Sequence, residues 1–211
     1  SRRQRQMCIR DSPCTITDFE VPKKYGLRQT IADTLGIGGI FRALRTIPVM
    51  KAYADDMERW CPNALFLNYT NPMAMLAGYM QRYTNIRTVG LCHSVQGCAS
   101  GLLGTLGMDE YIDNCRWKIA GINHQAWLLE IEDLKGNDLY PEIKRRAEDP
   151  AYNTDRNDLV RLKIMKEFGY YVTESSEHTS EYTPYFIKDK YPELIEQYKI
   201  CLLYTSDAAD D

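Results

Sequence analysis

Apolar positions in the first half of the chain form helical stripes and short continuous runs. Residues 27–61 carry a stripe at helical spacing, and the glycines of GIGG at 36–39 predict a break into two helices. Two short runs bounded by turn residues predict buried strands, NALFLNY at 63–69 and IRTVGLC at 86–92. Each is followed by a helical segment, and this alternation indicates a parallel α/β sheet.

The second half of the chain has a different pattern. RWKIAGINHQAWLLEIE at 116–132 alternates and is rich in β-prone residues, which predicts antiparallel strands. Residues 133–157 are polar and rich in Pro, Asp and Asn, which predicts a loop region. The pattern of residues 158–171 predicts an amphipathic helix that ends at Gly169. These elements indicate an α+β part after the parallel sheet.

The two ends of the chain differ from everything between them. RRQRQMCIRD can be back-translated to a DNA sequence whose reverse complement, read in another frame, encodes CLLYTSDAAD, and that DNA resembles a transposase adapter used to prepare sequencing libraries. We expect residues 1–12 and 201–211 to be adapter-derived tails. The remainder is then expected to be an internal fragment of a longer gene.

Composition narrows the classes of function. With 26 Lys and Arg against 29 Asp and Glu the net charge is −3, and without a basic stripe we expect no nucleic-acid partner. No apolar run approaches the roughly 18 residues of a membrane span, so we expect a soluble protein with no membrane association. Five irregularly spaced cysteines remain outside the tails, which suits a reducing cytoplasm. They are Cys14, Cys61, Cys92, Cys98 and Cys115.

A cysteine and a histidine stand where a metal could bind. Cys92 ends the second predicted parallel strand, at the edge where open α/β sheets place ligands, and His124 lies in the next strand region. A thiolate with an imidazole suits a borderline or soft divalent ion and leaves positions open for substrate oxygens. The residues alone equally allow Cys92 to be a small buried side chain.

Two further stretches carry polar groups with two interpretations each. Asn71, after the first predicted strand, could cap the following helix or contact a cofactor or substrate. The segment ESSEHTSEY at 174–182 could be a solvated loop or could deliver an acid or base.

Five motifs in order resemble the α-galactosidases of glycoside hydrolase family 4 over essentially all of residues 15–200. The tetrapeptide Cys92-His93-Ser94-Val95 resembles the α-galactosidase (melibiase) branch rather than the phospho-glucosidase branches. The motifs are TDFEVPKKYGLRQTIADTLGIGGIFRALRTIP, NYTNPMAM, GLCHSVQG, AGINHQAW and GYYVTESSEHTSEYTPYF.

The resemblance implies an exception among glycosidases, which commonly use two carboxylates. It implies hydrolysis of α-galactosides such as melibiose by oxidation, elimination, addition and reduction at the sugar, with NAD and Mn²⁺ or another divalent metal as cofactors. Cys92 and His124 match the metal ligands, His93 the general acid, and Asn71 a substrate-binding asparagine.

The catalytic base is left open by the resemblance. The candidates are Tyr171, Glu174 and Glu177, with Tyr182 behind them. Arg42 and Arg45 could orient neighbouring loops or substrate, or lie on a helix surface.

The resemblance also implies a domain organisation. Residues 13–114 are expected to be the C-terminal part of an NAD-binding, Rossmann-like sheet of the lactate/malate dehydrogenase type, and 115–200 part of an α+β substrate- and metal-binding domain. The Gly-rich turn that binds a dinucleotide does not appear, so no cofactor-binding residue is assigned. We therefore expect the polypeptide as written to bind NAD poorly, aggregate and be inactive. The full-length protein is expected to be a cytoplasmic homo-oligomer.

Three alternatives remain. A lactate/malate dehydrogenase-like oxidoreductase would accumulate NADH without a metal. A sugar- or nucleotide-binding regulator would have no need of an acid beside the metal. Other specificities within the family, for α-glucosides or α-galacturonides, stay open on one tetrapeptide.

Overall fold

The computed structural model describes residues 13–152 and 158–201. The expected tails lie outside the described residues, apart from Cys201. The chain divides into two compact units between Leu91 and Cys92, with Cys201 assigned to the first unit. The domain boundary expected between 114 and 115 lies inside the second unit and stays a prediction.

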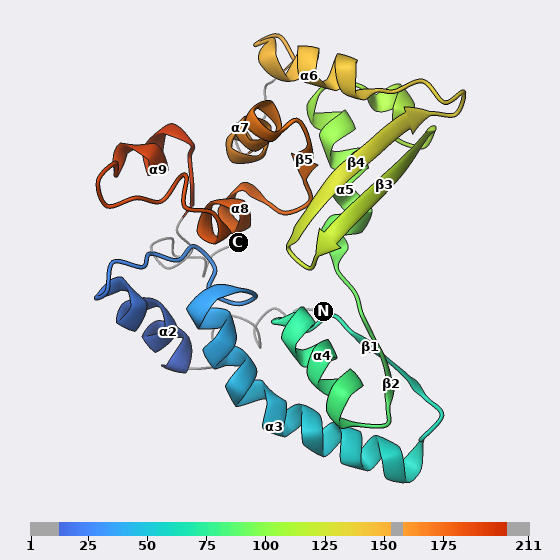
Figure 1. Ribbon diagram of the computed structural model, residues 1–211, viewed down its shortest axis with the longest axis vertical. Coiled ribbons are helices and arrows are strands. Elements are labelled where there is room, and N and C mark those ends of the chain that lie inside the picture. The colour runs from blue at the N-terminus through green and yellow to red at the C-terminus, as the bar shows by residue number, and fades with distance from the viewer. Residues whose placement is uncertain (1–12, 153–157, 202–211) are drawn as a thin grey trace. The chain divides into compact units, whose positions relative to one another are not determined.

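The first unit contains a parallel pair of strands with helices. Its elements are α2 (Pro13–Lys23), α3 (Gly36–Trp60), β1 (Leu65–Asn68), α4 (Met73–Tyr83) and β2 (Arg87–Gly90) (Figure 1). β1 and β2 pair in parallel from Leu65 opposite Arg87 to Asn68 opposite Gly90, which confirms the predicted parallel α/β arrangement. A small core joins α3 to α4 and the start of β2. Its buried members are Met50, Ala54, Leu76, Met80 and Ile86.

The prediction for residues 27–61 was wrong in its first part. The α3 helix begins at Gly36, so the glycines of GIGG start one helix instead of separating two. A Cβ on Gly38 would lie 2.6 Å from the carbonyl oxygen of Ala32, so the preceding loop packs directly on this first turn. The glycine thus permits a close backbone approach.

The second unit is built on a three-stranded antiparallel sheet in the order β3-β4-β5. The strands are β3 (Cys115–Ile122), β4 (Gln125–Asp133) and the short β5 (Tyr171–Val172), which confirms the antiparallel strands predicted at 116–132. In Figure 1 the β3–β4 hairpin lies against α5, and α7 lies beside β5. The helices are α5 (His93–Thr105), the 3-10 turn η1 (Asp109–Tyr111), α6 (Tyr140–Glu148), α7 (Leu159–Phe168), α8 (Ser176–Tyr182) and α9 (Glu193–Gln197).

The core of this unit joins α5 to the sheet and to α6 and α7. Leu102 and Leu103 of α5 are fully buried in one cluster with Leu128 and Ile131 of β4. α5 therefore belongs by packing to the antiparallel unit, although it follows a parallel strand in the chain.

Residues 133–157 were expected to be loop, and this was wrong for α6. Tyr140 and Ile143 are buried in the core, and their packing stabilises a helix in a mostly polar segment. The helix predicted at 158–171 is confirmed as α7, which ends at Gly169 with φ 86°.

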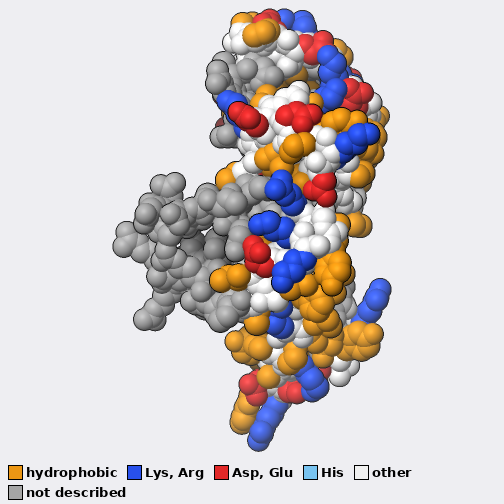
Figure 2. Space-filling model, turned by 90° about the vertical axis from the view of Figure 1, so that its left-hand side faces the viewer, with side chains coloured by type: hydrophobic (Ala, Val, Ile, Leu, Met, Phe, Trp, Pro, Cys, Tyr) orange, Lys and Arg blue, Asp and Glu red, His pale blue; other side chains and the backbone are white. Residues whose placement is uncertain are grey.

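Apolar side chains remain exposed on the first unit. Leu65, Leu67 and Val89 of the parallel pair are 53%, 55% and 41% exposed. Hydrophobic side chains also gather in the lower part of Figure 2, which views the left-hand side of Figure 1 and therefore not the face of the strand pair. Within the described ranges, every helix is too short or too polar to cross a membrane.

The hairpin offers a test of the fold. Gly121 has φ 143°, and a Cβ there would lie 2.5 Å from the carbonyl oxygen of Gln125. We expect Gly121→Ala to lower the free energy of unfolding by about 1–3 kcal/mol more than Gly136→Ala, because overpacking adds to backbone strain. Gly136 is the matched control, since its φ is 87° and a Cβ there meets nothing within 4 Å. Denaturant unfolding measures both, and equal losses would contradict the close packing.

Candidate metal centre

Three segments of the second unit bring a thiol, an imidazole and a carboxylate together. Cys92 stands at the N-cap of α5, His124 lies in the β3–β4 turn, and Glu174 follows β5. Glu174 Oε1 is 3.6 Å from Cys92 Sγ and 3.6 Å from His124 Nε2. One donor atom from each residue lies within 4.8 Å of the others. We call these three residues the donor triad.

Strand register explains why Glu174 reaches His124. In the β4–β5 pair, Trp127 lies opposite Val172, and the Thr173 N–H donates to the Ala126 carbonyl at 3.0 Å. Continuing this antiparallel register places Glu174 opposite Gln125, the neighbour of His124.

The hairpin turn presents His124 in an uncommon conformation. Ile122 pairs with Gln125, so Asn123 and His124 form a two-residue turn, and His124 has φ 63°. A left-handed backbone costs a non-glycine residue roughly 1–2 kcal/mol. Such outliers cluster at functional sites, where the side chain is needed.

The donor triad has the chemistry of a site for a divalent cation. His124 and Glu174 are buried and Cys92 is partly buried. Thiolate, imidazole and carboxylate are ligands of transition metals, and three protein ligands leave coordination positions for substrate or water. A buried carboxylate beside a thiol is also a place where a cation lowers the cost of burial.

The other cysteine of α5 lacks these properties. Cys98 is buried in the core, and burial raises the pKa of its thiol to about 11. It therefore stays protonated near neutral pH and is a packing residue.

A second histidine, which the sequence did not single out, lies beside the donor triad. The ring centroid of His178 is 4.5 Å from that of His124, and its Nδ1 is 2.8 Å from the Tyr182 hydroxyl. His178 and Tyr182 both belong to α8. The side chain of Ser175, the N-cap residue of this helix, accepts a hydrogen bond from the His178 N–H. The segment 174–182 is thus mainly a short helix. The signal was its density of ionisable residues, but only the folded chain shows which of them face His124.

The remaining candidates have separate surroundings. His93 is exposed in the first turn of α5, next to Cys92 in the chain, and Glu177 is partly buried in the first turn of α8. Asn71, in the first unit, donates from Nδ2 to Asp33 Oδ2 at 3.3 Å. It does not cap α4, because the N-cap residue is Pro72.

Two further candidates are engaged in polar contacts. Arg45 donates from Nη1 to the buried Asp18 at 3.0 Å. The Tyr171 hydroxyl donates to Asp158 Oδ2 at 2.6 Å, deep in the core. Burial raises the pKa of the Tyr171 phenol well above its ordinary value, Arg161 opposes that effect and Asp158 adds to it. This environment favours the phenol as a structural donor over a base.

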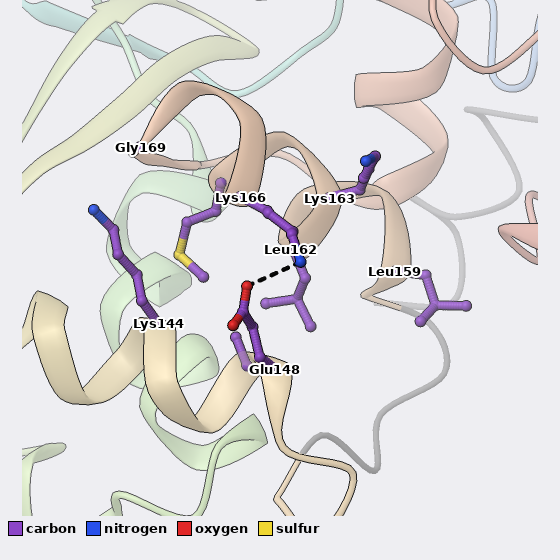
Figure 3. A pocket seen from close by; sticks show the side chains of 9 residues that line it. Lys144, Glu148, Leu159, Leu162, Lys163, Lys166 and Gly169 are labelled. Carbon is purple, nitrogen blue, oxygen red and sulfur yellow. Dashed lines mark ion pairs between the residues drawn. The ribbon is translucent and has the colours of Figure 1, made fainter.

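A surface cavity of about 340 Å³ lies between α6 and α7. Lys166 faces Glu148 across it at 3.0 Å (Figure 3). Lys163, which also lines the cavity, pairs with Glu167. None of the donor triad lines this cavity. None of the other candidate residues from the sequence lines it either.

Comparisons with known proteins agree with the motifs. Residues 5–108 match the model for the family 4 glycosyl hydrolases, and residues 119–210 match the model for the C-terminal domain of the same family. The α-galactosidase of Bacillus subtilis (strain 168) is 63% identical over 190 residues, which are 90% of this chain and 43% of that protein. The α-galactosidase of Rhizobium meliloti (strain 1021) is 37% identical over 173 residues, 81% of this chain and 34% of that protein. The chain thus spans less than half the length of these relatives.

Solved structures agree with the fold. A 6-phospho-alpha-glucosidase from gut microorganisms, solved in complex with NAD and Mn²⁺, superposes with a TM-score of 0.65 at 22% identity. The match covers 89% of this chain and 46% of that one. The likeness confirms the expected fold class, a Rossmann-like sheet followed by an α+β part.

The buried tyrosine predicts how stability depends on pH. An unfolded tyrosine ionises near pH 10, whereas Tyr171 resists ionisation in the fold, so its contribution is complete below about pH 10 and is lost as pH rises further. The loss should reach about 1.4 kcal/mol per pH unit for this group. Urea unfolding of the wild type and Tyr171→Phe at pH 8 and above pH 10 measures it. The variant should lose less stability over that interval, and equal losses would contradict the assignment.

Proposed function

The chain belongs to family 4 of the glycosyl hydrolases, and we propose that it supplies the metal-binding part of an α-galactosidase. The convergence of Cys92, His124 and Glu174 is the observation that carries the proposal. The specificity rests on the 63% identity to the Bacillus subtilis α-galactosidase and on the tetrapeptide Cys92-His93-Ser94-Val95.

The donor triad would hold the metal, which we propose to be Mn²⁺ or another divalent ion. Thiolate, imidazole nitrogen and carboxylate oxygen fit such an ion without a change of register in the strands that carry them. When bound, the ion supplies a Lewis acid to sugar oxygens. Glu174, a candidate base from the sequence, is assigned here as the third ligand because its Oε1 lies at the same distance from both other donors.

NAD is proposed as the second cofactor, on the family and on the similar 6-phospho-alpha-glucosidase solved with NAD and Mn²⁺. A nicotinamide supplies reversible hydride transfer. The sequence contains no G-x-G-x-x-G turn, so this chain's residues toward NAD stay unassigned.

Proton transfer is assigned to imidazole and phenol groups near the triad. We assign His93 as general acid, because it is exposed beside Cys92 and histidine is the side chain that most often moves protons in catalysis. Of the base candidates, Tyr182 has the best support, since its hydroxyl contacts His178, whose ring packs on His124. Glu177 is the second candidate, and Tyr171 is disfavoured by its bond to Asp158.

The proposal includes substrate and setting. Asn71 is kept as a substrate-binding residue, and α-galactosides such as melibiose are the proposed substrates. A metal-binding thiol needs a reducing compartment, which supports a cytoplasmic location. A homo-oligomer remains the expected assembly.

Activity tests the proposal directly. The complete gene product that contains residues 13–200 should hydrolyse p-nitrophenyl-α-galactoside only with both NAD⁺ and Mn²⁺, and should accumulate no NADH. Turnover that persists after both cofactors are removed would refute the mechanism. Net NADH formation from a hydroxy acid would instead indicate a dehydrogenase.

Metal affinity tests the donor triad without turnover. Cys92→Ser, His124→Ala and Glu174→Gln should each weaken Mn²⁺ binding by more than tenfold, since each removes a ligand, and even outer partners cost about 10–100-fold. Titration followed by electron paramagnetic resonance of free Mn²⁺ measures the dissociation constants. Cys61→Ser and Glu167→Gln are matched exposed controls that should bind as the wild type does. An unchanged affinity in Glu174→Gln would remove that residue from the site.

A further inference from the structure

A largely buried arginine donates hydrogen bonds to the backbone just before Glu174. Arg161 of α7 donates from Nε and Nη2 to the Val172 carbonyl oxygen at 3.3 and 3.1 Å, and from Nη2 to the Thr173 carbonyl oxygen at 3.4 Å. Its side chain is 18% exposed. Arg161 therefore contacts the two peptide units that lead into the proposed ligand.

The guanidinium is itself fixed from two sides. Arg161 Nη1 lies 3.3 Å from Asp158 Oδ1, and the guanidinium carbon lies 4.2 Å from the centroid of the Tyr171 ring. The other oxygen of Asp158 accepts the Tyr171 hydroxyl, and the Tyr171 N–H donates to the Tyr140 hydroxyl at 3.1 Å. Arg161 is thus held in place by buried residues of the core.

The segment that Arg161 holds needs such support. β5 has two residues and is the edge strand of its sheet, so β4 supports it along one side only. An edge strand leaves backbone groups without a strand partner. Here the planar guanidinium of Arg161 donates to carbonyl oxygens at the end of that strand.

Electrostatics points in the same direction. Burial disfavours the Arg161 cation, but Tyr171, Asp158, Cys98 and Glu174 outweigh burial and raise its pKa. The positive charge of Arg161 is therefore stabilised partly by Glu174, the residue that follows the two carbonyl groups it contacts.

We propose that Arg161 is a positioning residue for the metal site, which sets the Glu174 carboxylate against Cys92 and His124 through the Val172 and Thr173 carbonyl groups. The proposal rests on the proposed function, because it takes Glu174 as a ligand. It assigns Arg161 no contact with substrate or cofactor. An arginine that served only core stability would leave the metal affinity of the folded protein unchanged.

Two substitutions separate positioning from folding. Arg161→Met keeps much of the apolar stem and removes all donors, whereas Arg161→Lys keeps the charge and removes the fork. In the complete gene product, Arg161→Met should weaken Mn²⁺ binding by about 10–100-fold, as loss of an outer partner does, with Arg161→Lys in between. Lys163→Gln is the control, since it removes a cation of the same helix whose ion-pair partner is the exposed Glu167. Circular dichroism and thermal melting confirm that each variant is folded.

A double-mutant cycle with Glu174→Gln decides the route. If Arg161 acts through Glu174, the affinity of Arg161→Lys with Glu174→Gln should equal that of Glu174→Gln alone within about twofold. Affinity losses that multiply, or a folded Arg161→Lys that binds Mn²⁺ as the wild type does, would overturn the proposal and leave the metal site standing. A wild type that binds no Mn²⁺, or a Glu174→Gln variant with wild-type affinity, would instead refute the donor triad itself.

Discussion

The pairing of β5 with β4 is the constraint on which the candidate site depends. Two residue pairs and the bond from Thr173 to Ala126 bring Glu174 beside His124 across about fifty residues of chain. Each such hydrogen bond contributes only about 0.5–1.5 kcal/mol net, so the register needs more than the ladder. Leu128 and Tyr171, one opposite the other, are both essentially fully buried, and slipping β5 by one residue would move Tyr171 out of the core. Packing therefore fixes the position of the carboxylate.

The sequence predicted the parts of the site that depend on local pattern. Short apolar runs predicted a parallel strand that ends at Cys92, and the strand is confirmed but ends two residues earlier, at Gly90. Alternation predicted antiparallel strands around His124, and these are confirmed with His124 in the turn between them. The parallel and antiparallel sheets followed from the same reasoning. The family resemblance supplied the cofactors and the general acid, which the residue pattern alone left open.

The parts that were missed depend on distant contacts. α6 forms because its apolar residues reach the core, and they recur at helical spacing but are too few to outweigh the polar composition that predicted a loop; they are Leu139, Tyr140, Ile143 and Ala147. Glu174 became a ligand candidate only through the register of β5, a strand too short to be recognised from sequence. His178 lay in a segment already noted for its charges, but its packing on His124 arises from how α8 docks. The error at residues 27–35 has a similar cause, since Gly38 serves a close approach of two backbone segments.

Electrostatics connects the donor triad to its surroundings. In the structure Cys92 Sγ lies 3.6 Å from Glu174 Oε1, so the two donors already face each other. Metal binding needs a thiolate and releases protons, which is why binding of a divalent cation at such a site strengthens as pH rises. The Glu174 carboxylate is one of the groups that raise the pKa of the Arg161 guanidinium, and α5 and β4, which flank the triad, are packed in the buried core of the unit.

X-ray absorption spectroscopy of the Mn²⁺-loaded complete gene product tests the central claim most directly. The account predicts one sulfur neighbour with nitrogen and oxygen neighbours around the metal, and loss of the sulfur signal in Cys92→Ser. A metal surrounded by nitrogen and oxygen alone, with a spectrum that Cys92→Ser leaves unchanged, would contradict it.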